Sequence, residues 1–382
     1  MKLRSRPKLL VICSTLIVVF YIEYVSYYVK SWNWPSIKCS SSECLKLLLV
    51  ADPQILGEKT ESALTRWDCD RYLSKNFLLA LNHVRPDIIL FLGDLMDEGS
   101  RASAEEYSRY KERFFSIYRA EAHVQMLFIP GDNDIGGEDE SITTSKLERY
   151  RKTFDSFSAV NVKFAEFIKV NRLTESFPSE KGAHSPGANC SRILLSHLPL
   201  LPVSTGFVER VITQLRPQLI FSAHEHKSFH FDADIDVRSG KIVGHYRVFP
   251  LGGSEAAMKT AAAKKAQGKK SLSSWMFYLG DSIVHEIMVP TCSYRMAVPY
   301  IGFGAATLAP LATEGVEVAY EDEYDSVDGI ARDSGKMVLH YSVLWLPSRL
   351  AQLTFYEFFV CALLVGLLIW KISFCNSRSL RG

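Results

Sequence analysis

The apolar positions in the middle of the chain fall into short continuous runs, each of which ends in polar residues. Five of these runs, rich in Leu, Ile, Val and Phe, span residues 45–51, 87–92, 124–130, 192–196 and 218–223. Continuous runs of this length are typical of strands that are buried on both faces of a sheet. The sequence therefore predicts five core strands.

Amphipathic segments lie between these predicted strands. Residues 68–83, 103–120 and 143–157 repeat apolar side chains at helical spacing and are predicted to be helices. Alternating strands and helices favour a layered α/β fold, whose sites gather beyond the carboxyl ends of the strands. We therefore expect an α/β domain over residues 45–312.

Two longer apolar segments lie near the ends of the chain. Residues 9–28 contain Glu23 as their only charge, and residues 353–370 contain only Glu357. About 20 apolar residues in a helix are enough to span the hydrocarbon core of a bilayer. Both segments are therefore predicted to be transmembrane helices.

Basic residues outside these two segments predict their orientation. By the positive-inside rule, the tails at residues 1–8 and 371–382 face the cytosol, and residues 29–350 face the secretory lumen or the cell exterior. Linkers are expected at residues 29–44 and 313–350, on either side of the domain. The basic residues are Lys2, Arg4, Arg6 and Lys8 before the first segment, and Lys371, Arg378 and Arg381 after the second.

Each apolar segment has a second interpretation. A cleaved signal peptide also has a basic start and an apolar core, but residues 21–34 are bulky and aromatic and offer no small-x-small cleavage site. A buried core helix is the alternative for residues 353–370, although the length of this segment and the basic residues after it favour a membrane span.

Charge and cysteine content narrow the class of protein further. The formal net charge of +2 comes with no basic stripe, so nothing attracts nucleic acid electrostatically. The tripeptide Asn189-Cys190-Ser191 fits the N-glycosylation pattern, in agreement with a lumenal domain. Five cysteines outside the spans and the cytosolic tail allow at most two disulfides and leave the pairing open: Cys39, Cys44, Cys69, Cys190 and Cys292.

Residues that bind metals well follow every one of the five predicted strands. Because neighbouring strands of an α/β sheet present their carboxyl ends at one edge, we expect these side chains to converge. A Gly-Asp pair after a strand is more often a turn, and a lone His-x-His is more often exposed, but the repetition at five strand ends favours a site. In chain order the residues are Asp52, Gln54, Asp94, Asp97, Asp132, Asn133, Asp134, His197, His224 and His226.

This set of residues suits a two-metal phosphoesterase. Two divalent cations can cancel the charge of a phosphate ester and lower the pKa of a water molecule, but they need a carboxylate between them. Asp94 is placed to bridge, in a Gly-Asp turn directly after a strand. The other ligands form two predicted sets: Asp52, Gln54 and His226 for one metal, and Asp132, His197 and His224 for the other. Mixed His and carboxylate ligands suit Mn, Fe or Zn better than an all-oxygen Ca site.

The order of these motifs resembles D-x-H, G-D-x-x-D, G-N-H-D, H and G-H-x-H of the calcineurin-like metallophosphoesterase superfamily, over about residues 45–230. The strings DPQ, GDLMDEG, GDNDIGG and VPTCSYRM are similar to its membrane-anchored metallophosphoesterase 1 and Cdc1/Ted1-like branch.

The resemblance implies a layered α/β/β/α sandwich between two transmembrane helices, and two metal ions, with Mn first and Fe or Zn as alternatives. It implies a phosphodiesterase of the ER or Golgi that removes ethanolamine phosphate from a mannose of the glycosylphosphatidylinositol (GPI) anchor. The substrate would be a membrane lipid or a GPI-anchored protein. The catalytic positions that it implies are Asp94, Asp97, Asn133 and Asp134.

Three departures from the family pattern affect this expectation. Gln54 stands where the superfamily usually has His, and Ala223 replaces the Gly before His224. Asp132 and Asn133 replace Asn and His, and Asn cannot act as a general acid, a loss that typically costs about 10²–10⁴-fold in rate. His184 and His245 are other candidates for the proton donor. A metal-binding but catalytically weak scaffold for GPI-anchored cargo, and a cell-surface ectophosphatase, therefore remain alternative functions.

Overall fold

The computed structural model describes residues 6–37, 39, 43–154, 157–178, 190–252, 274–311 and 337–379. These residues form two compact units. One is a body over Trp34–Trp345, and the other joins the two ends of the chain, Met1–Asn33 and Leu346–Gly382. Each unit is described separately below.

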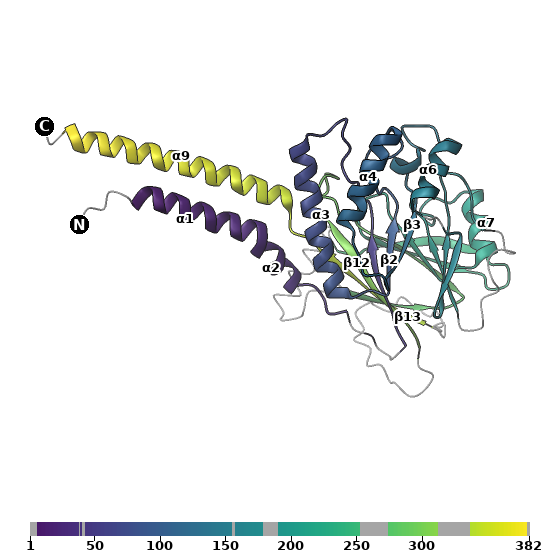
Figure 1. Cartoon of the computed structure of the whole chain (residues 1–382). Coiled ribbons are helices and arrows are strands. Elements are labelled where there is room, and N and C mark those ends of the chain that lie inside the picture. Colours follow the sequence, from purple (N-terminus) through teal and green to yellow (C-terminus); the bar gives the residue numbers. More distant parts are fainter. Residues whose placement is uncertain are drawn as a thin grey trace. The chain divides into compact units, whose positions relative to one another are not determined.

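The body is built on two β-sheets that face each other, as Figure 1 shows. The first has the order β10-β13-β12-β1-β2-β3, and β1, β2 and β3 run parallel in it. Its strands are β1 (Leu45–Val50), β2 (Ile88–Leu92), β3 (Gln125–Ile129), β10 (Ser274–Leu279), β12 (Gly302–Pro310) and β13 (Met337–Trp345).

The second sheet has the order β4-β5-β6-β7-β11-β8-β9, with β5, β6, β7 and β11 parallel. Its strands are β4 (Ala159–Val162), β5 (Ala165–Lys169), β6 (Ser191–Leu195), β7 (Leu219–Ser222), β8 (Phe229–Ile235), β9 (Ile242–Pro250) and β11 (Ile283–Met288). Both sheets contain parallel strands, which need helical crossovers between them.

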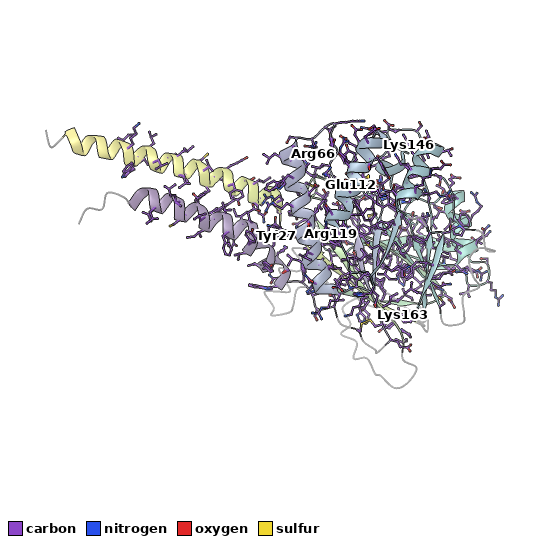
Figure 2. All side chains as sticks on the ribbon, viewed as in Figure 1. Tyr27, Arg66, Glu112, Arg119, Lys146 and Lys163 are labelled. Carbon is purple, nitrogen blue, oxygen red and sulfur yellow. A yellow bond between two sulfur atoms is a disulfide. The ribbon has the colours of Figure 1, made fainter. Side chains whose placement is uncertain are left out.

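Helices supply the crossovers from β1 to β2, from β2 to β3 and from β6 to β7, and they cover the outer faces of the sheets. Ser62 caps α3, and Ser103 forms a capping box with Glu106 at the start of α4, so side chains satisfy the first free N–H groups of both helices. Glu112 on α4 and Arg119 just after it are exposed charged residues, and both are labelled in Figure 2. The helices are α3 (Ala63–Val84), α4 (Ala104–Ile117), α5 (Asp132–Ile135), α6 (Thr144–Phe154) and α7 (Gly206–Leu215).

Apolar packing holds the body together, and two of its layers lie on the two faces of the second sheet. The larger lies between the sheets, where residues such as Leu49 and Leu90 of the first sheet pack with Ile193 and Phe221 of the second. The smaller lies between the second sheet and α7. The body is therefore a mixed α/β sandwich with two sheets. The five predicted strands correspond to β1, β2, β3, β6 and β7, and the three predicted helices to α3, α4 and α6, so these predictions are confirmed.

The linker predicted over residues 313–350 is wrong for residues 337–345. These residues form β13, which pairs antiparallel with both β12 and β10 inside the first sheet. Its apolar residues, among them Leu339, Tyr341 and Val343, are buried in the core between the sheets. The first and last residues of the body are in contact, because the indole N–H of Trp34 donates to the carbonyl of Trp345 at 2.8 Å.

The remaining predictions concern the glycosylation site, two other histidines and the cysteines. Asn189 and His184 lie outside the described residues, whereas His245 is exposed on β9. Cys39 and Cys44 form a disulfide, which the sequence left open. Cys69, Cys190 and Cys292 are free thiols.

The second unit consists of the two apolar ends of the chain. Arg6–Trp32 is one continuous helix made of α1 (Arg6–Phe20), a π-helical turn η1 (Tyr21–Val25) and α2 (Ser26–Trp32), and Arg349–Ser379 is α9. By length and composition, residues 9–32 and 349–372 could each cross a membrane, with a mean hydropathy of 2.1. Their most apolar stretches are only 6% and 0% buried, which is unlike the core helix of a soluble protein.

Candidate metal centre

The ends of β1, β2, β3, β6 and β7 bring the predicted ligands together. Asp52, Asp94 and His197 offer ligand atoms that lie within 4.8 Å of one another, and Asp132, His197 and His224 do the same. His197 belongs to both groups, which makes the cluster continuous. The clustered Asp and His residues therefore suit a dinuclear metal site.

Asp94 lies at the middle of the cluster and is held by two amide side chains. Gln54 Nε2 and Asn133 Nδ2 each donate to Asp94 Oδ2 at 2.9 Å, and the backbone N–H of Asn133 donates to Oδ1 at 3.0 Å. Gln54 and Asn133 thus fix the orientation of this carboxylate. The amide oxygen of Gln54 remains the atom of that residue that could bind a metal.

His197 is buried and points one nitrogen at the carboxylates. Its Nδ1 lies 2.8 Å from the carbonyl of Leu92, so Nδ1–H donates there and Nε2 is the nitrogen left to face the carboxylates or a metal. Nε2 lies 3.1 Å from Asp132 Oδ1 and 3.4 Å from Asp94 Oδ1. A histidine whose other ring nitrogen donates to a backbone carbonyl is the usual arrangement of a metal ligand.

The two remaining histidines lie at the rim of the cluster. His224 Nδ1 is 3.3 Å from Asp132 Oδ1, and His226 Nε2 is 4.0 Å from Asp52 Oδ1. Burial is the main cause that lowers the pKa of His226 to about 4, so its imidazole is neutral, as a metal ligand must be. His226 is in neither of the two ligand groups, and the division into two ligand sets stays a prediction.

The carboxylates of the cluster are buried close together, an arrangement that a cation would stabilise. Burial raises the pKa of Asp52 to about 7, although nearby His197 opposes the shift. Asp52 Oδ2 is buried and has no hydrogen-bond partner among the described residues. Burial lowers the pKa of His197, but Asp94, Asp132 and Asp52 outweigh it and raise that pKa to about 10. A buried oxygen without a partner, beside two more carboxylates, fits divalent metal ions.

Several of these residues have a left-handed backbone. The φ angles are 45° at Asp52, 38° at Gln54, 51° at Asp94, 73° at His224 and 61° at His226. Such angles are uncommon for residues other than Gly and gather at functional sites, where the surrounding structure compensates for the strain. Nothing in the sequence indicated this conformation. Ala223 does not have a positive φ, so the replacement of the family's Gly there is tolerated.

Gly131 is required because the loop after β3 approaches Asp94 closely. A Cβ at this position would collide with the carboxylate and the backbone nitrogen of Asp94. We expect Gly131→Ala to displace Asp94 and to lower kcat/KM by about 10²-fold, as a misplacement of reacting groups by about 1 Å can do. Steady-state kinetics would check this. Gly206→Ala is the matched control, because nothing lies within 4 Å of its Cβ. Equal activity of the two variants would contradict the expectation.

Asp134 lies beneath the site and orients its loops. It is buried and accepts backbone N–H bonds from Leu95, Met96 and Gly131 at 3.0–3.1 Å. Burial and then Asp94 raise its pKa to about 8. Asp134 is in neither ligand group, and its contacts are those of a positioning residue.

Asp97 is half-buried and also lies outside both ligand groups. Burial and the neighbouring Glu98 raise its pKa to about 6. Its catalytic role, like that of Asp134, stays a prediction.

Three residues near the site were missed by the sequence reasoning. Thr291 Oγ1 donates to the carbonyl of Asp52 at 2.8 Å, and Cys292 N–H donates to the carbonyl of Ala51 at 3.1 Å. They hold the loop after β1 from a distant part of the chain. Glu138 Oε1 lies 3.4 Å from His224 Nε2. The string VPTCSYRM, which includes Thr291, was the available signal, but it indicated a resemblance and no role.

Comparisons with known proteins agree with this geometry. Residues 45–228 match the family model described as calcineurin-like phosphoesterase. A protein named Metallophosphoesterase 1 from Ailuropoda melanoleuca is 27% identical over 290 residues, covering 60% of this chain and 74% of that protein. Its namesake from Cricetulus griseus is 30% identical over 289 residues, covering 59% and 74%. Matches to other relatives span about half of their length, for example 46% and 57%.

Among solved structures, purple acid phosphatase PPD1 from yellow lupin seeds is similar at 10% identity, with a TM-score of 0.38, covering 65% of this chain and 54% of that one. The extent and identity of the match to the Cricetulus griseus relative, together with the family model, show the family. The chain therefore belongs to the calcineurin-like phosphoesterases, a family of metal-dependent phosphoester hydrolases.

Proposed function

We propose that this chain is a membrane-anchored, two-metal phosphodiesterase that removes ethanolamine phosphate from the glycan of a GPI anchor in the ER or Golgi lumen. The observation that carries the two-metal phosphoesterase part is the cluster of three buried carboxylates around His197, with His224 beside it. The substrate part rests on the resemblance of the motifs to the membrane-anchored branch and on the two apolar terminal helices.

The residues of the chain divide into ligands and supports. Bound divalent ions, with Mn as the first expectation, would neutralise the phosphate and lower the pKa of the attacking water. Asp52, Gln54 and His226 would hold one ion and Asp132, His197 and His224 the other, with Asp94 between them. Asn133 and Gln54 keep Asp94 oriented, and Leu92 keeps the Nε2 atom of His197 directed into the site.

The apolar helices support a substrate in the membrane. An enzyme anchored in the same bilayer as its lipid substrate meets it at a raised effective concentration. The disulfide between Cys39 and Cys44 agrees with an oxidising compartment such as the secretory lumen. Both tails would then be cytosolic, as the basic residues outside the helices predict.

Metal removal tests the proposed function directly. The full-length chain in detergent micelles is expected to carry two metal ions, to lose both its ions and its activity in a chelator, and to regain them with Mn. Elemental analysis and hydrolysis of a phosphodiester and of a matched monoester measure this. Faster hydrolysis of the diester, and release of ethanolamine phosphate from a GPI glycolipid, are the expected results. Preference for the monoester would favour an ectophosphatase instead.

A catalytically weak scaffold for GPI-anchored cargo is the second candidate, and Asn133 is the observation that favours it. The side chain of Asn133 donates to Asp94 and cannot supply a proton to a leaving group at neutral pH. Two bound metals without hydrolysis of any phosphoester would support this function.

A further inference from the structure

We propose that the two apolar ends of the chain pair with each other in the membrane as an antiparallel helical hairpin, locked by a polar cluster. The cluster, called the clamp below, consists of Glu23 and Ser26 from the first helix and Arg349, Gln352 and Tyr356 from α9. This inference goes beyond the proposed function, because it concerns how the anchor is built and holds whatever ester the body hydrolyses.

The clamp connects the two helices through three direct contacts. Arg349 Nη1 and the hydroxyl of Tyr356 donate to Glu23 Oε1 at 3.0 and 2.9 Å, and Gln352 Nε2 donates to Ser26 Oγ at 2.9 Å. Arg349 Nη1 also donates to Gln352 Oε1 at 3.0 Å, which links the contacts on α9 to one another. The side chains of Arg349 and Glu23 are 4% and 12% exposed.

The backbone of the first helix is adapted at this point. Residues 21–25 form the π-helical turn, and the N–H of Ser26 donates to the carbonyl of Tyr21, five residues earlier. A π-turn accommodates one extra residue and changes which side chains face a neighbouring helix, and such turns are frequent at functional sites. Here the turn contains Glu23 and ends next to Ser26, the two clamp residues of this helix.

Beyond the clamp, each helix has partly covered residues. They recur three or four positions apart on both helices, as expected where one helix packs along another. Figure 1 shows α1 and α9 running side by side. The partly covered residues are Val11, Ser14, Thr15 and Val18 on α1, and Phe359 and Leu363 on α9.

The clamp pairs two charged residues of the apolar helices, Glu23 and Arg349. An unpaired Glu or Arg inside the hydrocarbon region is costly, so charged residues in membrane helices pair with one another and face a helix partner. The ion pair makes the charges of Glu23 and Arg349 compensate each other, and Tyr356 satisfies the same carboxylate oxygen. Interhelical hydrogen bonds of this kind hold membrane helices together where the hydrophobic effect cannot.

Disulfide cross-linking in membranes tests the pairing. Ser14 lies twelve residues before Ser26 and Leu363 eleven after Gln352, so they have similar depth in an antiparallel pair. In the full chain with Cys13→Ser, Cys361→Ser and Cys375→Ser, Ser14→Cys with Leu363→Cys should cross-link under mild oxidation. The control is Ile17→Cys with Val360→Cys. These two residues have similar depth to each other, about one helical turn nearer the clamp, but they are 67% and 51% exposed. We expect linking at least about tenfold faster in the first pair, because pairing raises the effective concentration of its thiols.

Non-reducing digestion and mass spectrometry of the linked peptides give the rates. Equal rates for the two cysteine pairs would overturn the hairpin. The clamp itself is tested by adding Glu23→Ala or Arg349→Ala to the first pair, and each is expected to slow linking several-fold. Together they should slow it no more than the worse single change, because each single change leaves the other charge buried and unpaired, whereas the double change removes both charges.

Glu357→Ala is the matched control for the clamp, because Glu357 is an exposed carboxylate on the same helix and lies outside the clamp. It should link at the unmodified rate. Linking that Glu23→Ala leaves unchanged would show that the clamp does not hold the helices. Phosphoester hydrolysis is measured on each variant, so a loss of pairing and a failure of the proposed function are separate results.

Discussion

Asp94→Asn is expected to lower kcat/KM for phosphoester hydrolysis by about 10³-fold or more, beyond the 10–100-fold typical of groups that only orient metal ligands. The amide has nearly the same size as the carboxylate but removes the negative charge at the middle of the cluster. The carboxylate accepts three hydrogen bonds from Gln54 and Asn133. In the variant, the NH₂ group of the new amide would face at least one of these N–H donors, and that hydrogen bond would be lost. Both metals should therefore bind more weakly.

Steady-state kinetics, metal analysis and thermal unfolding of the full-length protein check this result. Glu112→Gln is the control, since it removes one carboxylate from the exposed face of α4 and should keep full activity. The unfolding temperatures are compared after metal removal, where Asp94→Asn should stay near the parent chain, because removing one of several clustered buried carboxylates offsets the loss of the hydrogen bonds that it accepts. Hydrolysis within tenfold of the parent rate would exclude Asp94 as the bridging ligand.

Asn133→His is expected to raise kcat by about 10²-fold, the lower end of what a positioned general acid contributes. The side chain at this position already reaches Asp94, so an imidazole would lie within the site. The gain should disappear as the pH rises through the pKa of the new imidazole, because only the protonated form donates a proton. A pH profile of kcat would show this as a descending limb that the parent chain does not have.

Asn161→His controls for the general effect of a new histidine, because Asn161 is exposed on β4, away from the ligand groups. It should leave the profile unchanged. A loss of activity in Asn133→His would mean that the hold of Asn133 on Asp94 matters more than a proton donor. That outcome would also mean that the amide of Asn133 is needed to orient Asp94.

The strands and the ligands were predictable from sequence because both follow from local chemistry. A buried parallel strand must be apolar along its whole length, so β2 (Ile88–Leu92) could be predicted from its composition alone. Asp94 and His224 then follow their strands at once, and a short connection leaves little freedom for where a side chain can lie. The convergence of these ends was therefore predictable without any long-range information.

The parts that were missed depend on contacts between distant residues. The strongly acidic segment before β13 favours a linker, and the pairing of β13 with β12 and β10 is visible only in the sheet. The positive φ at Asp52 and Asp94 is a property of the folded chain that the residue types alone do not specify. The orientation of Asn133 depends on Asp94, which is 39 residues away in sequence. None of these features produces a repeating pattern of apolar and polar residues in the sequence.

The hydrogen bond between Trp34 and Trp345 means that the chain enters and leaves the body at neighbouring points. Domains with adjacent ends tolerate insertion into other proteins and circular permutation, because neither rearrangement has to bridge a gap. The body could thus be carried in a surface loop of an unrelated soluble host. New ends could also be opened between elements such as α7 and β7 once a short peptide joins the old ones.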